Sequence, residues 1–214
     1  MSSIVTDNPT ATADNTALGY DHKRLFYLHD LEDWKVHHDD TDVRNWDVKL
    51  TTGLKVGTVD NLIVDTTAKK VRYLEVNTER EFYNNYREEG YYLDNNSGRT
   101  FDADHDEQFI VPIGMVSLDH DNDCVIIESV QAEVIGKVPR YRRGSALMPS
   151  YEVRTVDFYS DVDPTYASTY DRTRYRNFDD AKFKSLGDSF YTSGYFNSDR
   201  YYDRHTEAIT SKGL

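Results

Sequence analysis

The chain has little cysteine and no long apolar run. Its 214 residues include a single cysteine, Cys124, which excludes an internal disulfide framework. Cys124 lies in the apolar run 124–127, a setting that predicts a buried strand thiol in a reducing cytoplasm and not a reactive nucleophile. No apolar stretch reaches the roughly 18 residues that a membrane-spanning helix needs, and the N-terminal residues are polar. We therefore expect a cytoplasmic protein with neither a transmembrane segment nor a secretory signal.

Basic residues are also scarce. There are 25 Lys and Arg against 38 Asp and Glu, which gives a formal net charge of −13. Nonspecific binding to nucleic acid or to anionic lipid needs a basic face, so this composition argues against direct nucleic-acid binding and favours solubility. Hydrophobic residues make up 38% of the chain, enough for a modest core in one domain with extensions or in two small domains.

The clearest pattern is a pair of β-rich runs at 53–65 and 71–76, joined by the polar turn 66–70. This arrangement predicts a β-hairpin. Gly53 and Gly57 stand where the strand must leave a tight turn and then bend, which glycine tolerates best. We expect a strongly curved small β-barrel, with strands at about 43–50, 56–65 and 70–78.

These residues also carry a family resemblance. Val-Gly-x-Val, an apolar run ending in Asp, and Arg-Tyr-Leu-Glu-Val, all within 53–76, resemble a PRC-barrel, the domain named after the H subunit of the purple bacterial photosynthetic reaction centre. Segments 33–44, 111–115, 127–140 and 151–170 are similar to other parts of that subunit's cytoplasmic domain. The residues that carry the structural motif are Gly53, Gly57, Asp60, Asp65, Arg72, Tyr73, Pro112 and Gly114.

The resemblance implies a mainly β fold, a small curved barrel with short helices, and a role in binding a partner. In the H subunit that partner is a membrane electron-transfer complex, reached through a transmembrane helix that this sequence does not show. Stand-alone bacterial PRC-barrel proteins look similar, and some are associated with stress responses. Fold is the firmer inference because one fold hosts many functions.

The sequence divides into three parts. We predict a flexible polar tail at residues 1–22, the barrel domain at residues 23–140, and an irregular extension rich in Tyr, Asp and Arg at residues 141–214. Aliphatic residues almost vanish after Val162, so the extension cannot build an aliphatic core of its own. We expect it to wrap the barrel or a partner, with a short helix at 178–187 and homo-oligomerisation; a disordered, adhesive tail is the alternative.

Charged residues within the barrel are predicted to be structural. Asp60 and Asp65 fit turn and strand-edge positions, where a carboxylate accepts backbone N–H groups. Arg72 and Glu75 are interpreted as outward-facing strand charges. After the barrel strands, residues 129–136 predict a short helix that is capped by its first residue, Ser129, and stopped by Gly136.

A tyrosine-rich insertion at 79–106 and a basic patch at 140–143 are the candidate contact faces. The tyrosines offer rigid amphipathic surface; alternatively, Phe82, Tyr86 and Leu93 pack back on the barrel. The arginines could grip phosphate or RNA, but the acidic composition favours pairing with the barrel or a neighbouring chain. The candidate partner-binding residues are Tyr83, Tyr86, Tyr91, Tyr92, Arg140, Tyr141, Arg142 and Arg143.

No metal site or cofactor is predicted. In His37-His38-Asp39-Asp40 the adjacent side chains are expected to diverge in a solvated turn, and no second histidine pair follows to complete a zinc site. Acidic clusters at 102–107 and 119–123 do not complete an EF-hand. A hairpin turn between 115–118 and 124–127 explains the second cluster; its low-affinity calcium candidates are Asp119, Asp121 and Asp123.

No catalytic constellation appears, since the sequence shows no phosphate loop, no paired cysteines and no supported Ser/His/Asp arrangement. We expect a non-enzymatic protein-binding or regulatory module, linked to stress or to electron-transfer complexes, with an unknown protein partner or self-association. One alternative is a ribosome accessory protein that binds a basic ribosomal protein, because ribosome maturation factors carry a PRC-barrel behind a second β-barrel. The other is a weakly calcium- or pH-responsive module.

Overall fold

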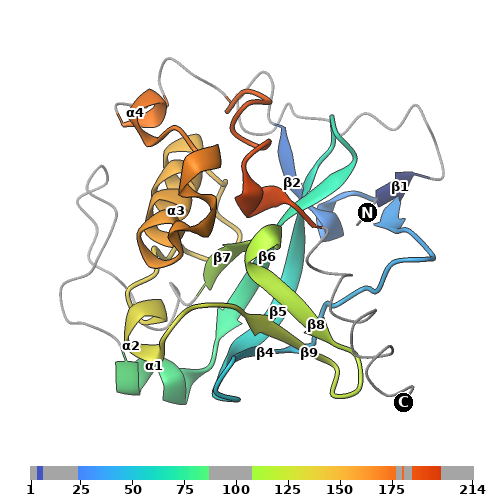
Figure 1. Ribbon diagram of the computed structural model, residues 1–214. Coiled ribbons are helices and arrows are strands. Elements are labelled where there is room, and N and C mark those ends of the chain that lie inside the picture. Colours follow the sequence, from blue (N-terminus) through green and yellow to red (C-terminus); the bar gives the residue numbers. More distant parts are fainter. Residues whose placement is uncertain (1–3, 7–23, 87–107, 177–179, 181–184, 199–214) are drawn as a thin grey trace, which may run out of the picture.

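A curved sheet of seven strands forms the centre of the computed structural model, with helices gathered on one side of it (Figure 1). The structure describes residues 4–6, 24–86, 108–176, 180 and 185–198. The strand order is β7-β6-β5-β4-β9-β8, and β2 also pairs with β5. The strands are β2 (Leu25–Tyr27), β4 (Asp47–Leu50), β5 (Lys55–Asp65), β6 (Lys70–Thr78), β7 (Gln108–Pro112), β8 (Val116–Asp119) and β9 (Cys124–Ile127).

The sheet is mixed. Every pairing is antiparallel except that of β4 with β9, which is parallel. The 3-10 turn η2 (Ile113–Met115) carries the chain from β7 into β8, yet no pairing joins these two outer strands in the part of the chain that the structure describes. The predicted mainly β fold is confirmed, whereas hydrogen bonding does not close the sheet into a barrel there.

The predicted hairpin is present as β5 and β6, which pair from Gly57 with Thr78 to Asp65 with Lys70. Gly53 has a φ of +84° in the turn between β4 and β5, a conformation that favours glycine. Gly57 lies where a Cβ atom would collide with the backbone oxygen of Asn77. Both glycines therefore serve the turn and the close strand approach that the sequence predicts.

Within the described residues, four α-helices and three further 3-10 turns follow or interrupt the strands. The longest, α3, spans Pro149–Val162 and begins with proline at its first turn, where the missing N–H costs no helical hydrogen bond. Its buried face includes Tyr151, Thr155, Val156 and Tyr159, at the spacing of one helical stripe. The others are α1 (Arg80–Tyr86), α2 (Ala132–Ile135), α4 (Arg172–Tyr175), η1 (Leu28–Asp30), η3 (Pro164–Thr169) and η4 (Gly194–Phe196).

The helix α3 corrects the expectation of an irregular extension. Together with the segments after it, α3 covers β6 and β7 on the face shown at the upper left of Figure 1. Consequently residues 71–76 of β6 are all buried, on both faces of the strand. The buried side chains of residues 149–196, where described, thus belong to the same core as the sheet.

Aromatic rings replace aliphatic side chains in this added layer. The ring of Phe190, fully buried, lies 5.1 Å from that of Tyr175, 5.5 Å from that of Phe196 and 5.9 Å from that of Tyr170, measured between centroids. The contacts with Tyr170 and Tyr175 are edge-to-face, the geometry that ring quadrupoles favour. Over the described residues, the extension packs against the sheet.

Two local predictions need correction. Residues Ile4–Thr6, placed in the flexible tail, form strand β1 and pair with β3 (Trp34–Val36). Gln131 and not Ser129 precedes the first turn of α2, and it makes no side-chain cap. Ser129 instead has a φ of +59°. Most of the predicted helix at 178–187 lies outside the described residues.

None of the described helices combines the length and the apolar character that crossing a membrane requires.

Candidate functional site

Two sequence-distant segments meet beside the end of β6. Gly136, at the end of α2, lies so close to α1 that a Cβ atom would collide with the backbone oxygen of Tyr86. Residues 140–143 then pass beside the start of β7, where the Tyr141 N–H donates to Gln108 O, and the side chains of Arg140 and Arg143 reach Thr78 and Asp60. We call this region the α1–α2 surface; it consists of Tyr83, Tyr86, Val134 and residues 140–143.

The predicted partner-binding residues are divided by the structure. Tyr83 is only 6% exposed and lies under the Arg140 guanidinium at 5.2 Å. Tyr86 is half-buried and stacks on Phe82, which is buried. Packing back on the barrel, the alternative for this insertion, therefore describes Phe82 and Tyr86. Tyr91, Tyr92 and Leu93 lie outside the described residues.

One arginine of the basic patch pairs with an acidic residue of the barrel domain, as expected. Arg143 forms an exposed ion pair with Asp60 at 2.5 Å, and Arg140 donates to the Thr78 hydroxyl. Tyr141 donates to a Glu75 carboxylate oxygen at 2.6 Å, and burial raises the pKa of Glu75 despite this hydrogen bond. Arg142 is exposed. Intramolecular pairing is confirmed for Arg143.

Arg72 and Glu75 are not outward-facing charges. Their exposures are 7% and 2%, because the C-terminal extension covers the β6 face that the sequence analysis left to solvent. Arg72 donates twice to the Asp65 carboxylate, at 2.9 and 3.1 Å, and Arg24 donates to the same oxygen at 2.6 Å. Two arginines from different segments therefore share one fully buried carboxylate.

Asp65 has the local role that the sequence predicts and a further one. Its other carboxylate oxygen accepts the backbone N–H groups of Thr67 and Ala68, at 3.1 and 3.0 Å, so the carboxylate shapes the β5–β6 turn. Burial raises the pKa of Asp65, but hydrogen bonds from Arg24, Ala68 and Arg72 outweigh it and hold the pKa below its usual value. Asp65 is therefore ionised inside the protein.

Tyr191 connects this ion cluster to α3. Its ring lies 4.7 Å from the Arg24 guanidinium and 4.8 Å from that of Arg72, within the range of cation–π attraction. Its hydroxyl donates to Glu152 Oε2 at 2.7 Å, and the Tyr73 hydroxyl donates to the same oxygen at 3.0 Å. Burial raises the pKa of Glu152 to about 8, with both tyrosine hydrogen bonds only partly opposing it.

Sequence reasoning missed Arg24, Glu152 and Tyr191. Glu152 lies 79 residues from Tyr73 and 39 from Tyr191 along the chain, so no local spacing links them. The one sequence signal was Tyr73 itself, which belongs to the motif and makes the hydrogen bond to Glu152. The remaining motif residues Pro112 and Gly114 lie at the turn from β7 into η2, and Gly114 contacts the backbone of Gly194 and Tyr195.

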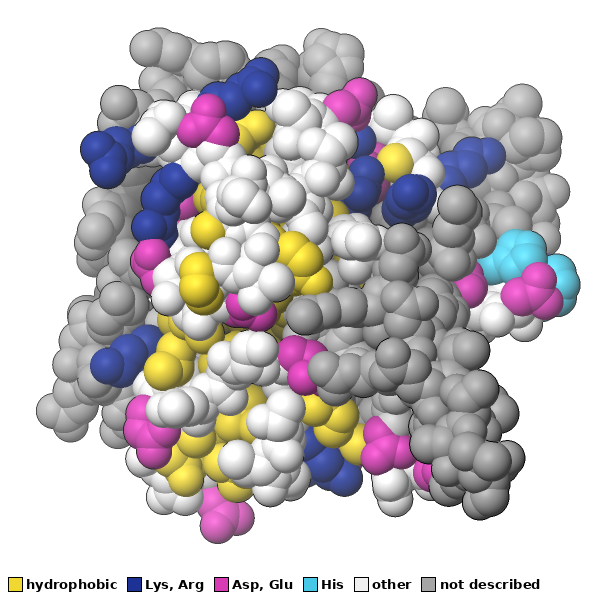
Figure 2. Space-filling model, in the orientation of Figure 1, with side chains coloured by type: hydrophobic (Ala, Val, Ile, Leu, Met, Phe, Trp, Pro, Cys, Tyr) yellow, Lys and Arg dark blue, Asp and Glu magenta, His cyan; other side chains and the backbone are white. Residues whose placement is uncertain are grey.

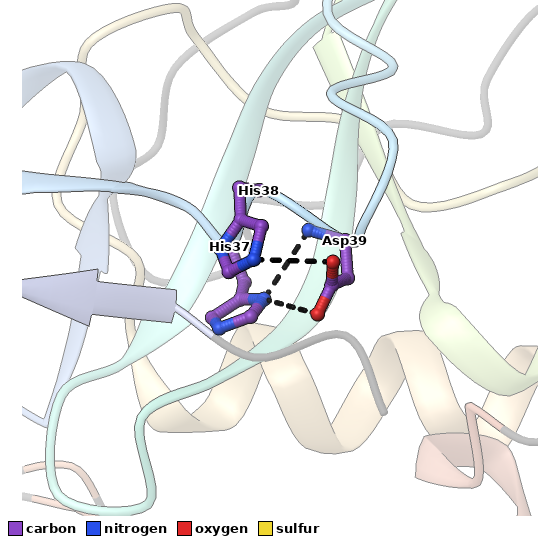
Figure 3. Close-up of side chains that lie close together, drawn as sticks. All are labelled: His37, His38 and Asp39. Carbon is purple, nitrogen blue, oxygen red and sulfur yellow. Dashed lines mark hydrogen bonds and ion pairs between the residues drawn. The ribbon is translucent and has the colours of Figure 1, made fainter.

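His37, His38 and Asp39 lie together, contrary to the expectation that these side chains diverge (Figure 3). A backbone hydrogen bond from Asp40 N to His37 O, at 2.9 Å, closes a turn directly after β3. Within this turn His37 Nδ1 lies 3.6 Å from Asp39 Oδ2, and His38 Nε2 lies 3.2 Å from Asp39 Oδ1. Successive side chains diverge in a strand, but this turn brings them to one side.

The turn at 119–123 matches the predicted hairpin, between β8 and β9. Asp119 Oδ1 accepts the backbone N–H groups of Asp121 and Asn122, each at 3.2 Å, which accounts for one acidic position structurally. Calcium binding by Asp119, Asp121 and Asp123 stays a prediction. Cys124 is 2% exposed, as expected, and burial raises the pKa of its thiol.

Comparison with known proteins agrees with the sheet described above. No curated protein matches the chain. The family model of the PRC-barrel domain matches residues 36–134, a span that contains the whole β4–β9 part of the sheet and most of α2. The resemblance inferred from the sequence is confirmed: the chain contains a PRC-barrel domain over residues 36–134.

Proposed function

We propose that this protein is a non-enzymatic protein-binding or regulatory module of the PRC-barrel type. The observation that supports the proposal is that the polar groups fall into two sets, one buried and hydrogen-bonded within the fold and one exposed at the surface. The buried polar groups around Asp65 and Glu152 are engaged with one another through hydrogen bonds of 2.6 to 3.1 Å. Such groups hold the C-terminal extension on the sheet, and the surface is left for recognition.

The α1–α2 surface is the proposed binding face. It combines the half-buried apolar side chains of Tyr86 and Val134 with the exposed Arg142, and Tyr and Arg are enriched at protein interfaces. Figure 2 shows hydrophobic side chains reaching the surface in a band over the helical side of the molecule. The partner is another protein or a second copy of the chain, in a stress-related setting or at an electron-transfer complex.

The test is affinity capture of the tagged full chain from its native lysate, separated into membrane, ribosomal and soluble fractions. Wild type is compared with Arg142→Glu and with Lys70→Glu, which makes the same charge change at the exposed start of β6. Lys70 lies five residues before Glu75, the strand residue that Tyr141 contacts, which is about 17 Å along an extended strand. Equal melting temperatures of the three proteins are the control for folding.

A partner retained by wild type and Lys70→Glu but lost from Arg142→Glu supports the proposal. Equal retention by all three variants contradicts the proposed face, and turnover of a substrate by the purified chain contradicts the non-enzymatic class.

The net charge of −13 favours a second candidate, a ribosome accessory protein that binds a basic ribosomal protein. Here the retained protein is basic, sediments with ribosomes and is released by salt, because screening weakens exposed charge pairs. Retention that is unchanged between low and high salt speaks against this candidate.

A further inference from the structure

We propose that His37, His38 and Asp39 form a site for a divalent transition-metal ion. This site lies on the N-terminal side of the sheet, after β3, and is separate from the α1–α2 surface. Two imidazole nitrogens and one carboxylate oxygen lie within 4.8 Å of one another, and these are donor types that zinc and copper prefer.

The geometry of the donor atoms fits such an ion. Tetrahedral zinc with bonds of about 2.0 to 2.1 Å places neighbouring donor atoms about 3.3 Å apart. The two imidazole-to-carboxylate separations, each to a different oxygen of Asp39, are 3.2 and 3.6 Å, close to that value, and all three donor atoms lie within 4.8 Å of one another. The two carboxylate oxygens face different imidazoles, so an ion between them meets all three side chains in the arrangement drawn in Figure 3.

The turn prepares His37 for binding. The backbone N–H of Asp39 donates to His37 Nδ1 at 3.3 Å, so this nitrogen presents its lone pair toward Asp39 and the ring proton resides on Nε2. A metal ion binds through that lone pair. On binding, the ion replaces the long hydrogen bond from the Asp39 N–H to His37 Nδ1. The same turn supplies all three donors, so ion binding requires no new chain segment.

The local charge attracts cations. Between residues 30 and 42 the sequence contains six acidic residues and one lysine, and the side chains of His38 and Asp39 are 81% and 75% exposed. A dissolved ion therefore reaches the donors without any opening of the fold, drawn by a negative local potential. With three protein donors, water occupies the remaining coordination positions, as in open zinc sites.

The test is calorimetric titration of the full chain with Zn²⁺ alone, together with electron paramagnetic resonance of the Cu²⁺-loaded protein. Wild type is compared with the double variant His37→Ala/His38→Ala, with Asp39→Asn, and with His120→Ala as a control that removes one imidazole near the β8–β9 turn. Circular dichroism and melting temperatures confirm that each variant is folded.

We expect one Zn²⁺ site in wild type and in His120→Ala. The double variant should lose more than the roughly 10- to 100-fold in affinity that removal of an outer-shell partner causes, and its Cu²⁺ spectrum should lose nitrogen hyperfine coupling. Asp39→Asn should bind about tenfold more weakly, since a neutral amide replaces a charged donor. No Zn²⁺ binding by wild type at millimolar concentration, or equal binding by wild type and the double variant, overturns the proposal.

Discussion

The PRC-barrel sheet and the C-terminal extension build one core with different chemistry. The sheet is held by aliphatic side chains at 0% exposure, such as Val48, Val59 and Leu74. The extension is held by tyrosine and phenylalanine rings, and the tyrosine hydroxyls reach buried carboxylates and backbone oxygens, as that of Tyr195 does with Asp163 O at 3.1 Å. Aliphatic burial is nondirectional, whereas each buried hydroxyl needs a partner in a defined place.

The difference is clearest at two buried carboxylates. Asp65, on the sheet, is ionised and shared by two arginines. Glu152, on α3, accepts two tyrosine hydroxyls and has its pKa raised to about 8 by burial, so it retains its proton at neutral pH. Tyr191 contacts both groups. The contact between the extension and the sheet therefore has a charged half, at Asp65, and a neutral half, at Glu152.

Removal of the charged half should have the largest effect. Asp65→Ala leaves Arg24 and Arg72 in a site where their side chains are 12% and 9% exposed. Breaking a buried pair in this way costs about 3 to 5 kcal/mol of unfolding free energy. The matched control is Asp60→Ala, whose partner Arg143 is 65% exposed and which should cost about 1 kcal/mol or less. Urea denaturation measures both; equal losses would contradict the assignment of Asp65 to the buried joint.

The backbone contact between η2 and η4 should come next. In Gly114→Ala the new Cβ atom collides with the backbone oxygen of Gly194 and lies 2.7 Å from that of Tyr195. Overpacking of this kind costs about 1 to 3 kcal/mol. Gly187→Ala is the control, because its Cβ meets no described atom within 4 Å. Thermal melting should be lower for Gly114→Ala alone; no difference would mean that the extension does not lie against η2.

The neutral half should show itself in the pH dependence of stability. The pKa of Glu152 rises from 4.5 to about 8 on folding, so the folded state binds more protons between these values. The unfolding free energy then falls as pH rises from about 4.5 to about 8 and levels off above that. Asp65 acts oppositely: its lowered pKa contributes stability that is lost when acid protonates it.

Glu152→Gln should flatten this decline without removing it, because the raised pKa of Glu75 acts with the same sign. Urea unfolding of wild type and variant at pH 5 and pH 8 measures the two slopes. Identical slopes would show that Glu152 does not bind a proton on folding.

The sheet was predictable because its signals are local. Gly53, Gly57 and the turn after Asp65 specify the β5–β6 hairpin within a few residues of one another. The metal candidates His37 to Asp39 were visible as residues, but their convergence depends on the turn closed by Asp40, which sequence spacing alone does not reveal.

The joint between sheet and extension was not predictable. From the sequence alone, Arg72 and Glu75 occupy strand positions that look solvent-facing. In the structure they contact Tyr191 and Tyr141, which lie 119 and 66 residues further along the chain. Aromatic residues alternating with polar ones gave no clear helical signal for α3, because Tyr151, Thr155 and Tyr159 share its buried face with only two valines, Val153 and Val156.

The central claim is that residues 149–196, where described, and the PRC-barrel sheet unfold as one cooperative unit. Native-state hydrogen exchange of the full chain tests this most directly, since it reports the opening free energy of each segment. The account predicts that the amides of α3 and the last hydrogen-bonded amides near η4 exchange with the same opening free energy as those of β5 and β6. Exchange of α3 at an opening free energy about 2 kcal/mol or more below that of β5 would contradict it.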